Sequence, residues 1–457
     1  MHVASTTVFE GPAPAYEELR DHIDSRLHLV PRFRQKLRLV PFGQGRPRWV
    51  DDPHLNLGYH IRHTALPDPG SDEQLRILAA RLFSQRLDRS KPLWEMWLVD
   101  GLEGDRFALV TKIHHALVDG VSGVDITNVL FDAAPDPPEP PASPEPWVPR
   151  PEPSDGQVLG EALIERVTSP AELVRGARAF VRGPRRAARA AVDALEAAGA
   201  LARAGVAAPA SPFNVDIGPY RRFATVDVPL AELKRIKNGA GGTVNDVVLA
   251  AVAGALGRYL RGHGHATQDL ELRAMVPISV RSDQQHGALG NQVSSYMAPL
   301  PIWCDDPIDR LHRVSETMGD LKASKQAVGA SLMTELADFA PPTIAAQAAR
   351  LQSRQRFFNL VVTNVPGPQF SLYLLGRELQ ALYPMVPLAR RQAVCFGIMS
   401  YNGQIHFGLI GDYDGMSDLE ALAADLDASL AELSAAVPGK RAVADPSPTA
   451  GKQKTKT

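Results

Sequence analysis

Two adjacent histidines, His114 and His115, lie in the segment FALVTKIHHALVDGVSG of residues 107–123, shortly before Asp119 and Gly120. Imidazole accepts a proton near neutral pH, so a histidine at the end of a strand is a candidate general base. The same residue types would also suit a metal site, because imidazole and carboxylate are good zinc ligands. A structural pair is the third interpretation, and it requires hydrogen-bond partners for both rings.

The rest of the sequence disfavours a metal site and a serine nucleophile. No third or fourth ligand stands near the histidines, and the zinc-binding helix pattern HExxH is absent. A GxSxG nucleophile elbow is also absent. We therefore predict no metal, and the general base and the structural pair stay open.

The segment that carries the histidines is predicted to be a strand, a loop and a helix. Residues 107–113 alternate as a mostly buried strand, residues 120–123 break the pattern, and residues 124–131 resume it at helical spacing. Just before it, residues 87–102 read LDRSKPLWEMWLVDGL, with Pro92 ahead of Trp94 and Trp97. We expect these tryptophans to pack in the core, at the start of a strand that is the hairpin neighbour of the histidine strand.

Apolar periodicity predicts further elements in both halves of the chain. Strands are expected at 2–9, 49–50, 59–64, 271–280, 292–300, 358–367, 393–401 and 404–411, with helices at 15–26, 72–85, 308–326, 332–352 and 417–436. Residues 220–238 are predicted to form a strand followed by a helix. The basic stretch 28–42 is interpreted as a half-buried strand, because its aromatic residues are too few for stacking on nucleic-acid bases.

A long apolar helix is predicted over residues 243–260, with Thr243, Asn245 and Asp246 at its start. Such residues cap helices by accepting hydrogen bonds from free backbone amides. An amide and a carboxylate at this place could equally orient or polarise a substrate. Both interpretations stay open.

A short internal echo indicates a duplicated unit. VDGVSGVDI at 118–126 and YDGMSDLEA at 413–421 each follow a predicted strand and precede a predicted helix. Aligning their Asp-Gly pairs sets Ile410 opposite His115. The second copy would therefore lack the candidate base.

Length and composition exclude several classes of protein. A chain of 457 residues exceeds one core, so two domains are expected, and a net charge of -2 gives no reason to expect nucleic acid as the partner. Two cysteines, Cys304 and Cys395, exclude a disulfide scaffold and agree with a reducing cytosol. The start MHVASTTVFEG lacks the pattern of a secretory signal, and no window resembles a membrane-spanning helix, so any membrane contact is expected to be peripheral.

Residues 135–215 are predicted to connect the two domains. Ten of the nineteen residues at 135–153 are proline, which is typical of a linker. The alanine-rich stretch 157–208 is helical in character and carries a basic stripe, formed by Arg175, Arg178, Arg182, Arg185, Arg186 and Arg189. This stripe is either a solvated face or an attraction site for anionic lipid headgroups or for the phosphates of a nucleotide-bearing substrate.

The motifs resemble those of a known family. HHALVDG at 114–120 resembles the HHxxxDG signature of the coenzyme A-dependent acyltransferase superfamily. Together with LDRSKPLWEMW, TVNDVVLA, MVPISVR at 275–281 and GNQVSS at 290–295, it resembles the bacterial wax ester synthase/diacylglycerol acyltransferase family. The resemblance runs from residue 1 to about residue 436.

This resemblance implies an α/β fold of two similar domains, each a mixed β-sheet flanked by helices, with an active-site tunnel between them. The corresponding division is residues 1–134, a linker at 135–215, a second domain at 216–437 and a disordered tail at 438–457.

The resemblance also implies a role for each motif residue. His115 would be the general base, with His114 in support, Asp119 in a structural role paired with an arginine, and Gly120 permitting the turn. Asn245 and Asp246 match the family's ND pair in a supporting role, and Pro92, Leu93 and Trp94 match its structural PLW element.

The implied activity is O-acyl transfer from acyl-CoA to diacylglycerol, to a long-chain alcohol or to both, with no acyl-enzyme and no bound cofactor. Acyl-CoA would be a cosubstrate, and the protein would be cytoplasmic, in peripheral contact with the inner face of an anionic membrane or with lipid droplets. Two alternatives stay open. One is an acyltransferase acting on a polyketide or lipid alcohol with a carrier-protein donor, and the other is an inactive lipid-binding homologue.

Overall fold

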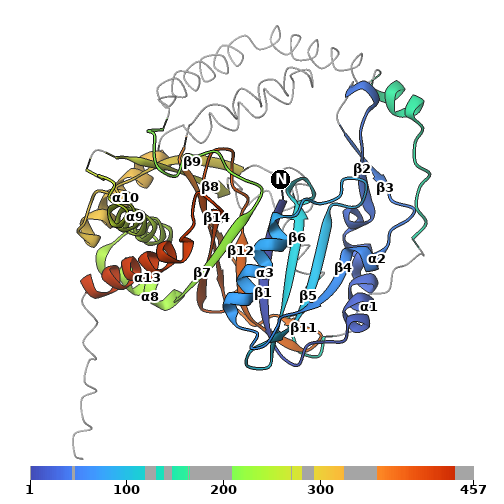
Figure 1. The fold of residues 1–457 in the computed structure, drawn as a ribbon, viewed down its shortest axis with the longest axis horizontal. Helices are drawn as coiled ribbons and strands as arrows, with labels where there is room; N and C mark the ends of the chain where they lie inside the picture. Colours follow the sequence, from blue (N-terminus) through green and yellow to red (C-terminus); the bar gives the residue numbers. More distant parts are fainter. Residues whose placement is uncertain are drawn as a thin grey trace, which may run out of the picture.

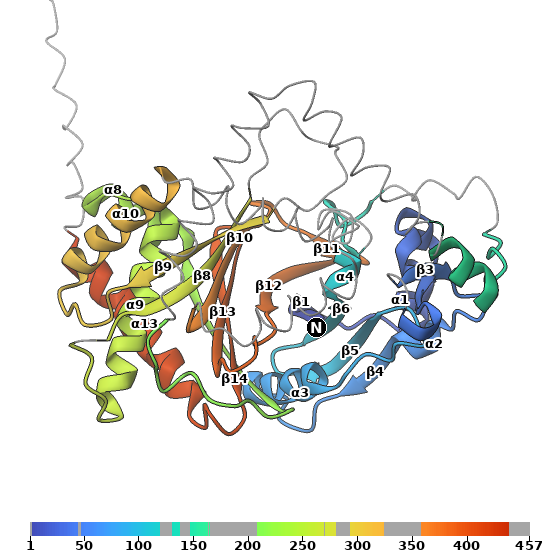
Figure 2. The same cartoon turned by 90° about the horizontal axis from the view of Figure 1, so that it is seen from above.

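Two six-stranded β-sheets, each with its own helices, form the described part of the chain (Figures 1 and 2). The computed structural model describes residues 2–43, 47–118, 130–137, 147–162, 164, 208–268, 270–279, 293–323 and 358–437. Within these residues no single helix is long and apolar enough to cross a membrane. The helices Leu230–Ala240 (α8) and Val244–Gly262 (α9), bent by 96° at their break, meet the length and composition criterion as a pair.

The first sheet has the strand order β11-β12-β1-β6-β5-β4. Its strands are β1 (His2–Glu10), β4 (Ile61–Ala65), β5 (Trp94–Leu102), β6 (Arg106–His114), β11 (Tyr373–Leu374) and β12 (Arg377–Met385). Only β4 and β5 pair in parallel, so the sheet is mixed. Its helices are α1 (Tyr16–Arg26), α2 (Leu57–His60), α3 (Asp72–Ser84) and α4 (His115–Val118).

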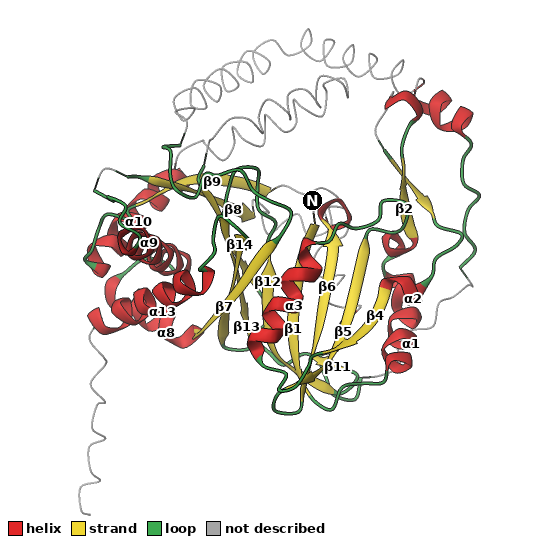
Figure 3. Cartoon of the chain, viewed as in Figure 1, coloured by secondary structure: helices red, strands yellow, loops and turns green. Residues whose placement is uncertain are grey.

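The second sheet has the order β7-β14-β13-β10-β8-β9. Its strands are β7 (Arg221–Pro229), β8 (Leu272–Ser279), β9 (Val293–Leu300), β10 (Leu360–Pro366), β13 (Val394–Tyr401) and β14 (Gln404–Asp412). The pairs β8–β10 and β10–β13 are parallel and the others antiparallel. The helices α8 (Leu230–Ala240), α9 (Val244–Gly262), α10 (Pro307–Ala323) and α13 (Leu419–Ala436) gather on one face of this sheet (Figure 3).

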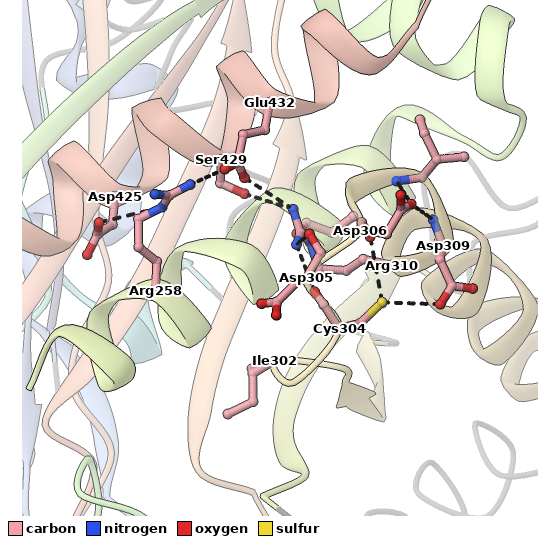
Figure 4. Close-up of polar contacts among 12 residues, drawn as sticks. Arg258, Ile302, Cys304, Asp305, Asp306, Asp309, Arg310, Asp425, Ser429 and Glu432 are labelled. Atoms are coloured by element: carbon pink, nitrogen blue, oxygen red, sulfur yellow. Dashed lines mark hydrogen bonds and ion pairs between the residues drawn. The ribbon is translucent and has the colours of Figure 1, made fainter. Parts of the chain in front are cut away.

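We call each six-stranded sheet together with its helices a unit. In the second unit a buried arginine contacts three helices, α9, α10 and α13. The guanidinium of Arg310, on α10, is 2% exposed and donates to the carbonyl of Ala250 on α9 at 3.0 Å. It also donates to the carbonyl of Cys304 at 2.9 Å (Figure 4). It also faces Ser429 and Glu432 of α13. Because a buried guanidinium is tolerated only when its donors find acceptors, these contacts fix how the three helices pack.

Strand β12 belongs to the carboxyl-terminal half of the chain but pairs with β1, with Tyr383 opposite Thr6. It also packs on the second sheet, where a Cβ at Gly408 would lie 2.0 Å from the carbonyl oxygen of Pro384. The predicted division into residues 1–134 and 216–437 therefore does not coincide with the two sheets, because β11 and β12 belong to the first sheet. Neither β11, which has only two residues, nor β12 is predicted from the sequence.

Most predicted elements in the described residues are present, with some corrected bounds. Residues 28–42 contain 3₁₀ turns at Leu27–Leu29, Pro31–Arg34 and Pro41–Gly43 around the short strand β2 (Gln35–Arg38), because the two prolines interrupt the ladder. Strand β2 pairs with β3 (Arg48–Asp51). Residues 57–60 are helical, so the strand predicted at 59–64 begins only at Ile61.

Part of the predicted linker packs on the β2–β3 hairpin. Lys36 and Arg38 of β2 both form ion pairs with Glu152, and the ring of Trp147 lies under the guanidinium of Arg34, 5.0 Å from it. Opposite charges therefore hold residues 147–162 against the first unit. The arginine stripe at 175–189, the helix predicted at 332–352 and the tail at 438–457 lie outside the described residues.

Candidate active site

The two histidines lie at the end of β6, between β1 and β5. His114 is the last residue of β6 and His115 the first of α4, and both are partly buried. The amide of His114 donates to the carbonyl of Leu93 at 2.9 Å, and His2 is its register partner on β1. The neighbours on both sides therefore fix the backbone position of His114. The antiparallel pairing of β5 and β6 confirms the predicted hairpin.

The imidazole of His114 closes the turn into α4. Its Nδ1 accepts the backbone N–H of Ala116 at 3.2 Å. An accepting Nδ1 carries no proton, so a neutral ring bears its proton on Nε2. This contact orients the ring, and the supporting role of His114 in the reaction stays a prediction.

Asp119 and Gly120 lie outside the described residues. The structural role predicted for Asp119, the identity of its arginine and the turn at Gly120 stay predictions.

The PLW element lies in the core beside the histidine strand, with Trp94 opposite Ile113. Trp94 is fully buried, donates from Nε1 to the carbonyl of Phe33 at 2.9 Å and stacks between the rings of Phe33 and His60, at 4.9 and 4.4 Å. The Nδ1 of His60 in turn lies 2.8 Å from the carbonyl of Trp94. Trp94 is therefore a packing residue, which agrees with the structural role predicted for the element.

The ND pair lies at the start of α9. A Thr243–Asp246 capping box closes this helix, since the amide of Thr243 donates to Oδ2 of Asp246 at 2.8 Å and the amide of Asp246 donates to Oγ1 of Thr243 at 3.2 Å. Asn245 accepts from Nδ2 of Asn364 at 3.3 Å, which joins the start of α9 to β10. These contacts lie within the second unit, so the supporting role of Asn245 and Asp246 at the reacting centre stays a prediction.

Sequence reasoning missed a polar cluster beside the histidines. Lys112 and Glu95 are directly opposite each other on β6 and β5, and both are buried. Burial lowers the pKa of Lys112, an effect that Glu95 opposes. The available signal was one charge inside the apolar run of each strand, Glu95 in residues 94–99 and Lys112 in residues 107–113, because opposite charges in adjacent strands are expected to pair.

His2 belongs to the same cluster. Burial lowers the pKa of its ring to about 4, although a hydrogen bond to the carbonyl of Phe83 opposes the shift. His2 is therefore neutral at neutral pH. Among the residues that the structure describes, no group of three or more histidine, cysteine or acidic side chains could hold a metal ion.

Two family models match successive parts of the chain. Residues 1–248 match the wax ester synthase/diacylglycerol acyltransferase catalytic domain, and residues 289–434 match the WS/DGAT C-terminal domain. A probable diacylglycerol O-acyltransferase of Mycobacterium tuberculosis strain H37Rv is 34% identical over 444 residues, covering 94% of this chain and 90% of the relative. A second one from that strain is 37% identical over 448 residues, covering 96% and 95%.

Solved structures show the same fold. The wax ester synthase/diacylglycerol acyltransferase from Marinobacter aquaeolei VT8 superposes with a TM-score of 0.65 at 29% identity, covering 95% of this chain and 94% of that one. The first condensation domain of the CDA synthetase gives a TM-score of 0.57 at 16% identity, covering 95% and 91%. The predicted architecture of two mixed sheets flanked by helices is confirmed.

Proposed function

Because the chain belongs to the wax ester synthase/diacylglycerol acyltransferase family, we propose that it moves a fatty acyl group from acyl-CoA to the hydroxyl of diacylglycerol, of a long-chain alcohol or of both. Family membership, which the HHALVDG and PLW motifs predicted, is confirmed by matches in both halves of the chain. The acceptor classes are those in the names of the family and of its relatives.

His115 acts as the general base. It takes the proton of the acceptor hydroxyl while the oxygen attacks the thioester carbonyl. The tetrahedral intermediate then collapses, the carbon–sulfur bond breaks, and the thiolate of coenzyme A takes the proton back from the imidazolium. The products are the ester and free coenzyme A, and no acyl-enzyme is needed.

The observation that carries this assignment is the placement of the two imidazoles at the end of β6. Nδ1 of His114 accepts the amide of Ala116, so His114 serves the turn and His115 is the better candidate for proton transfer. General base catalysis typically supplies about a hundredfold to ten-thousandfold in rate. Alignment of two bound reactants lowers the barrier by a further 7 to 11 kcal/mol or so.

The remaining assignments are part of the same proposal. Asp119 holds the loop through an arginine, Gly120 permits its turn, and Asn245 and Asp246 support the site from the start of α9. Acyl-CoA is a cosubstrate and not a resident cofactor. Since diacylglycerol and long-chain alcohols reside in lipid phases, the protein works in the cytoplasm, in peripheral contact with an anionic membrane or a lipid droplet.

The test uses the purified full chain with His115→Ala, acyl-CoA and either diacylglycerol or a long-chain alcohol. Release of coenzyme A thiol and ester formation, followed by mass spectrometry, should fall by at least about a hundredfold with the circular dichroism spectrum unchanged. His265→Ala, at an exposed histidine of the second unit, is the matched control and should keep wild-type turnover. Near wild-type turnover in His115→Ala would contradict the mechanism.

The same assay separates the alternatives. Acyl groups delivered on acyl-carrier protein and a panel of polyketide-like alcohols form a parallel set of reactions. Turnover only in that set would favour the carrier-protein acyltransferase. Lipid binding without turnover in any set would favour the inactive homologue.

A further inference from the structure

The end of β6 is held by a buried ion pair three residues before His115. Nζ of Lys112 lies 3.1 Å from Oε2 of Glu95, and the two residues are 2% and 4% exposed. The same ammonium donates to the carbonyls of Leu82 and Gln85 at 3.0 and 3.1 Å. Two N–H groups of the lysine therefore donate to backbone carbonyls in fixed directions, and the Glu95 carboxylate lies at ion-pair distance from the same ammonium.

One of these acceptors, the carbonyl of Leu82, belongs to the last turn of α3, and Gln85 is the residue that follows the helix. The carbonyls that end a helix carry partial negative charge, so a cation there is favourable. A second side chain from the first sheet reaches the same turn, because Nε2 of His2 lies 2.7 Å from the carbonyl of Phe83. Since His2 is the register partner of His114, the histidine strand β6 and its neighbour β1 are both attached to the end of α3.

The same turn of α3 also contacts the second unit. The amide of Arg221, the first residue of β7, donates to Oγ of Ser84 at 3.0 Å. In Figure 1, α3 lies between the first sheet and β7. The turn at residues 82–85 is thus a joint between β6, β1 and the second sheet.

The stability of the fold does not by itself explain a charge in this place. Replacing a buried ion pair by apolar residues of similar volume is often neutral or stabilising, whereas removing one partner is strongly destabilising. What an ion pair with directed hydrogen bonds adds is a defined position for the strand. Lys112 and His114 are separated by about 7 Å of extended chain and His115 is the next residue, so a shift of the lysine is transmitted to the base.

We infer that Lys112 is a positioning residue of the acyl-transfer site, which through Glu95 and the last turn of α3 sets the place of His115 relative to the second unit. This inference rests on the proposed function.

The test compares Lys112→Met, the double variant Glu95→Leu/Lys112→Met and a matched control, Arg310→Met. Arg310 is as buried as Lys112 but lies among the helices of the second unit. Lys112→Met should lower the thermal midpoint, because it leaves Glu95 buried without its main partner, and the double variant should recover it. The kcat of the double variant should stay roughly ten- to a hundredfold below wild type with KM unchanged, as expected for a displaced catalytic group.

The control measures how the loss of a buried cation far from the histidine strand affects stability and kcat. Arg310→Met should lower the thermal midpoint and keep the kcat of the folded protein. A double variant whose kcat recovers together with its thermal midpoint would overturn the inference, since the pair would then act on stability alone.

A second readout does not depend on activity. Hydrogen–deuterium exchange in peptides covering residues 106–118 should be faster in the double variant than in wild type, and unchanged in Arg310→Met. If the wild-type protein transfers no acyl group, the proposed function fails. Faster exchange in the double variant would still show that the Lys112–Glu95 pair holds the end of β6. Unchanged exchange would refute the positioning role of Lys112, whatever the activity of the variants.

Discussion

The carboxylate of Asp246 is part of the capping box at the start of α9. It accepts the amide of Thr243, and its Oδ2 also lies 3.3 Å from Oγ of Ser315 on α10. Capping was one of the two interpretations that the sequence left open for this residue. The hydrogen bonds of Asp246 favour capping, and those of Asn245 reach toward β10 instead.

Substitution at Asp246 can separate capping from chemistry. Asp246→Asn keeps an oxygen acceptor for Thr243, so it should retain most of the stability and the kcat of wild type. Asp246→Ala removes the acceptor and should lower the free energy of unfolding by about 1 kcal/mol, measured by urea denaturation. A large fall in kcat for Asp246→Asn at unchanged stability would instead assign the carboxylate to the reaction.

Helices α9 and α13 are joined at their ends by a histidine. His263, at the carboxyl end of α9, has Nδ1 2.8 Å from the carbonyl of Tyr259 and Nε2 2.7 Å from Oδ2 of Asp418, the residue before α13. Both partners are acceptors, so both ring nitrogens must carry protons, which is the imidazolium form. The hydrogen bond to Tyr259 and then the one to Asp418 raise the pKa of His263.

This contact predicts a pH-dependent contribution to stability. A folded-state pKa above the unfolded value of about 6.5 means that the stabilisation is fully present below that pH and is lost as the pH rises through the folded pKa. His263→Gln should therefore lower the free energy of unfolding more at about pH 5.5 than at about pH 8.5. Because the ring is exposed, the difference should stay below about 1 kcal/mol. Equal effects of the substitution in urea denaturation at both pH values would contradict it.

The two units of the molecule share a strand. β12 pairs with β1 in the first sheet, and Tyr383 on β12 donates to Oδ2 of Asp227 on β7 at 2.7 Å. Oδ1 of the same carboxylate lies 2.6 Å from Nδ1 of His406 on β14. This polar contact and the close approach of Pro384 to Gly408 tie β12 to the second sheet. The units are therefore expected to unfold together.

A methyl group at Gly408 should disturb this connection. Its Cβ would lie 2.0 Å from a backbone oxygen of β12, so either strand must shift. Gly408→Ala should lower the free energy of unfolding by roughly 1 to 3 kcal/mol, as overpacked cores do, and increase proteolytic cleavage at residues 373–385. Gly262→Ala is the control, because no atom lies within 4 Å of the added Cβ. Equal stability of the two variants would mean that β12 adapts without cost.

Much of the fold could be predicted because its signals are local. The alternation that predicts β6 and the spacing that predicts α3 and α9 are properties of short segments. The strand, turn and helix predicted for the second copy of the echo are present as β14 and α13, with Ile410 buried where the first copy has His115. The first copy lies outside the described residues beyond Val118.

The sequence by itself predicted the position of the histidine pair at the end of a strand, because alternation is a property of neighbouring residues. Its motifs also predicted the family, and through that resemblance the two mixed sheets. Only the tertiary structure decided that β12 joins the first sheet and that Lys112 donates to the end of α3. It also decided that the capping carboxylate of Asp246 accepts a hydrogen bond from Ser315 on α10. The physical reason is separation along the chain. Thr6 and Tyr383 become neighbours through hydrophobic packing and backbone pairing, and no local pattern in either segment specifies its partner.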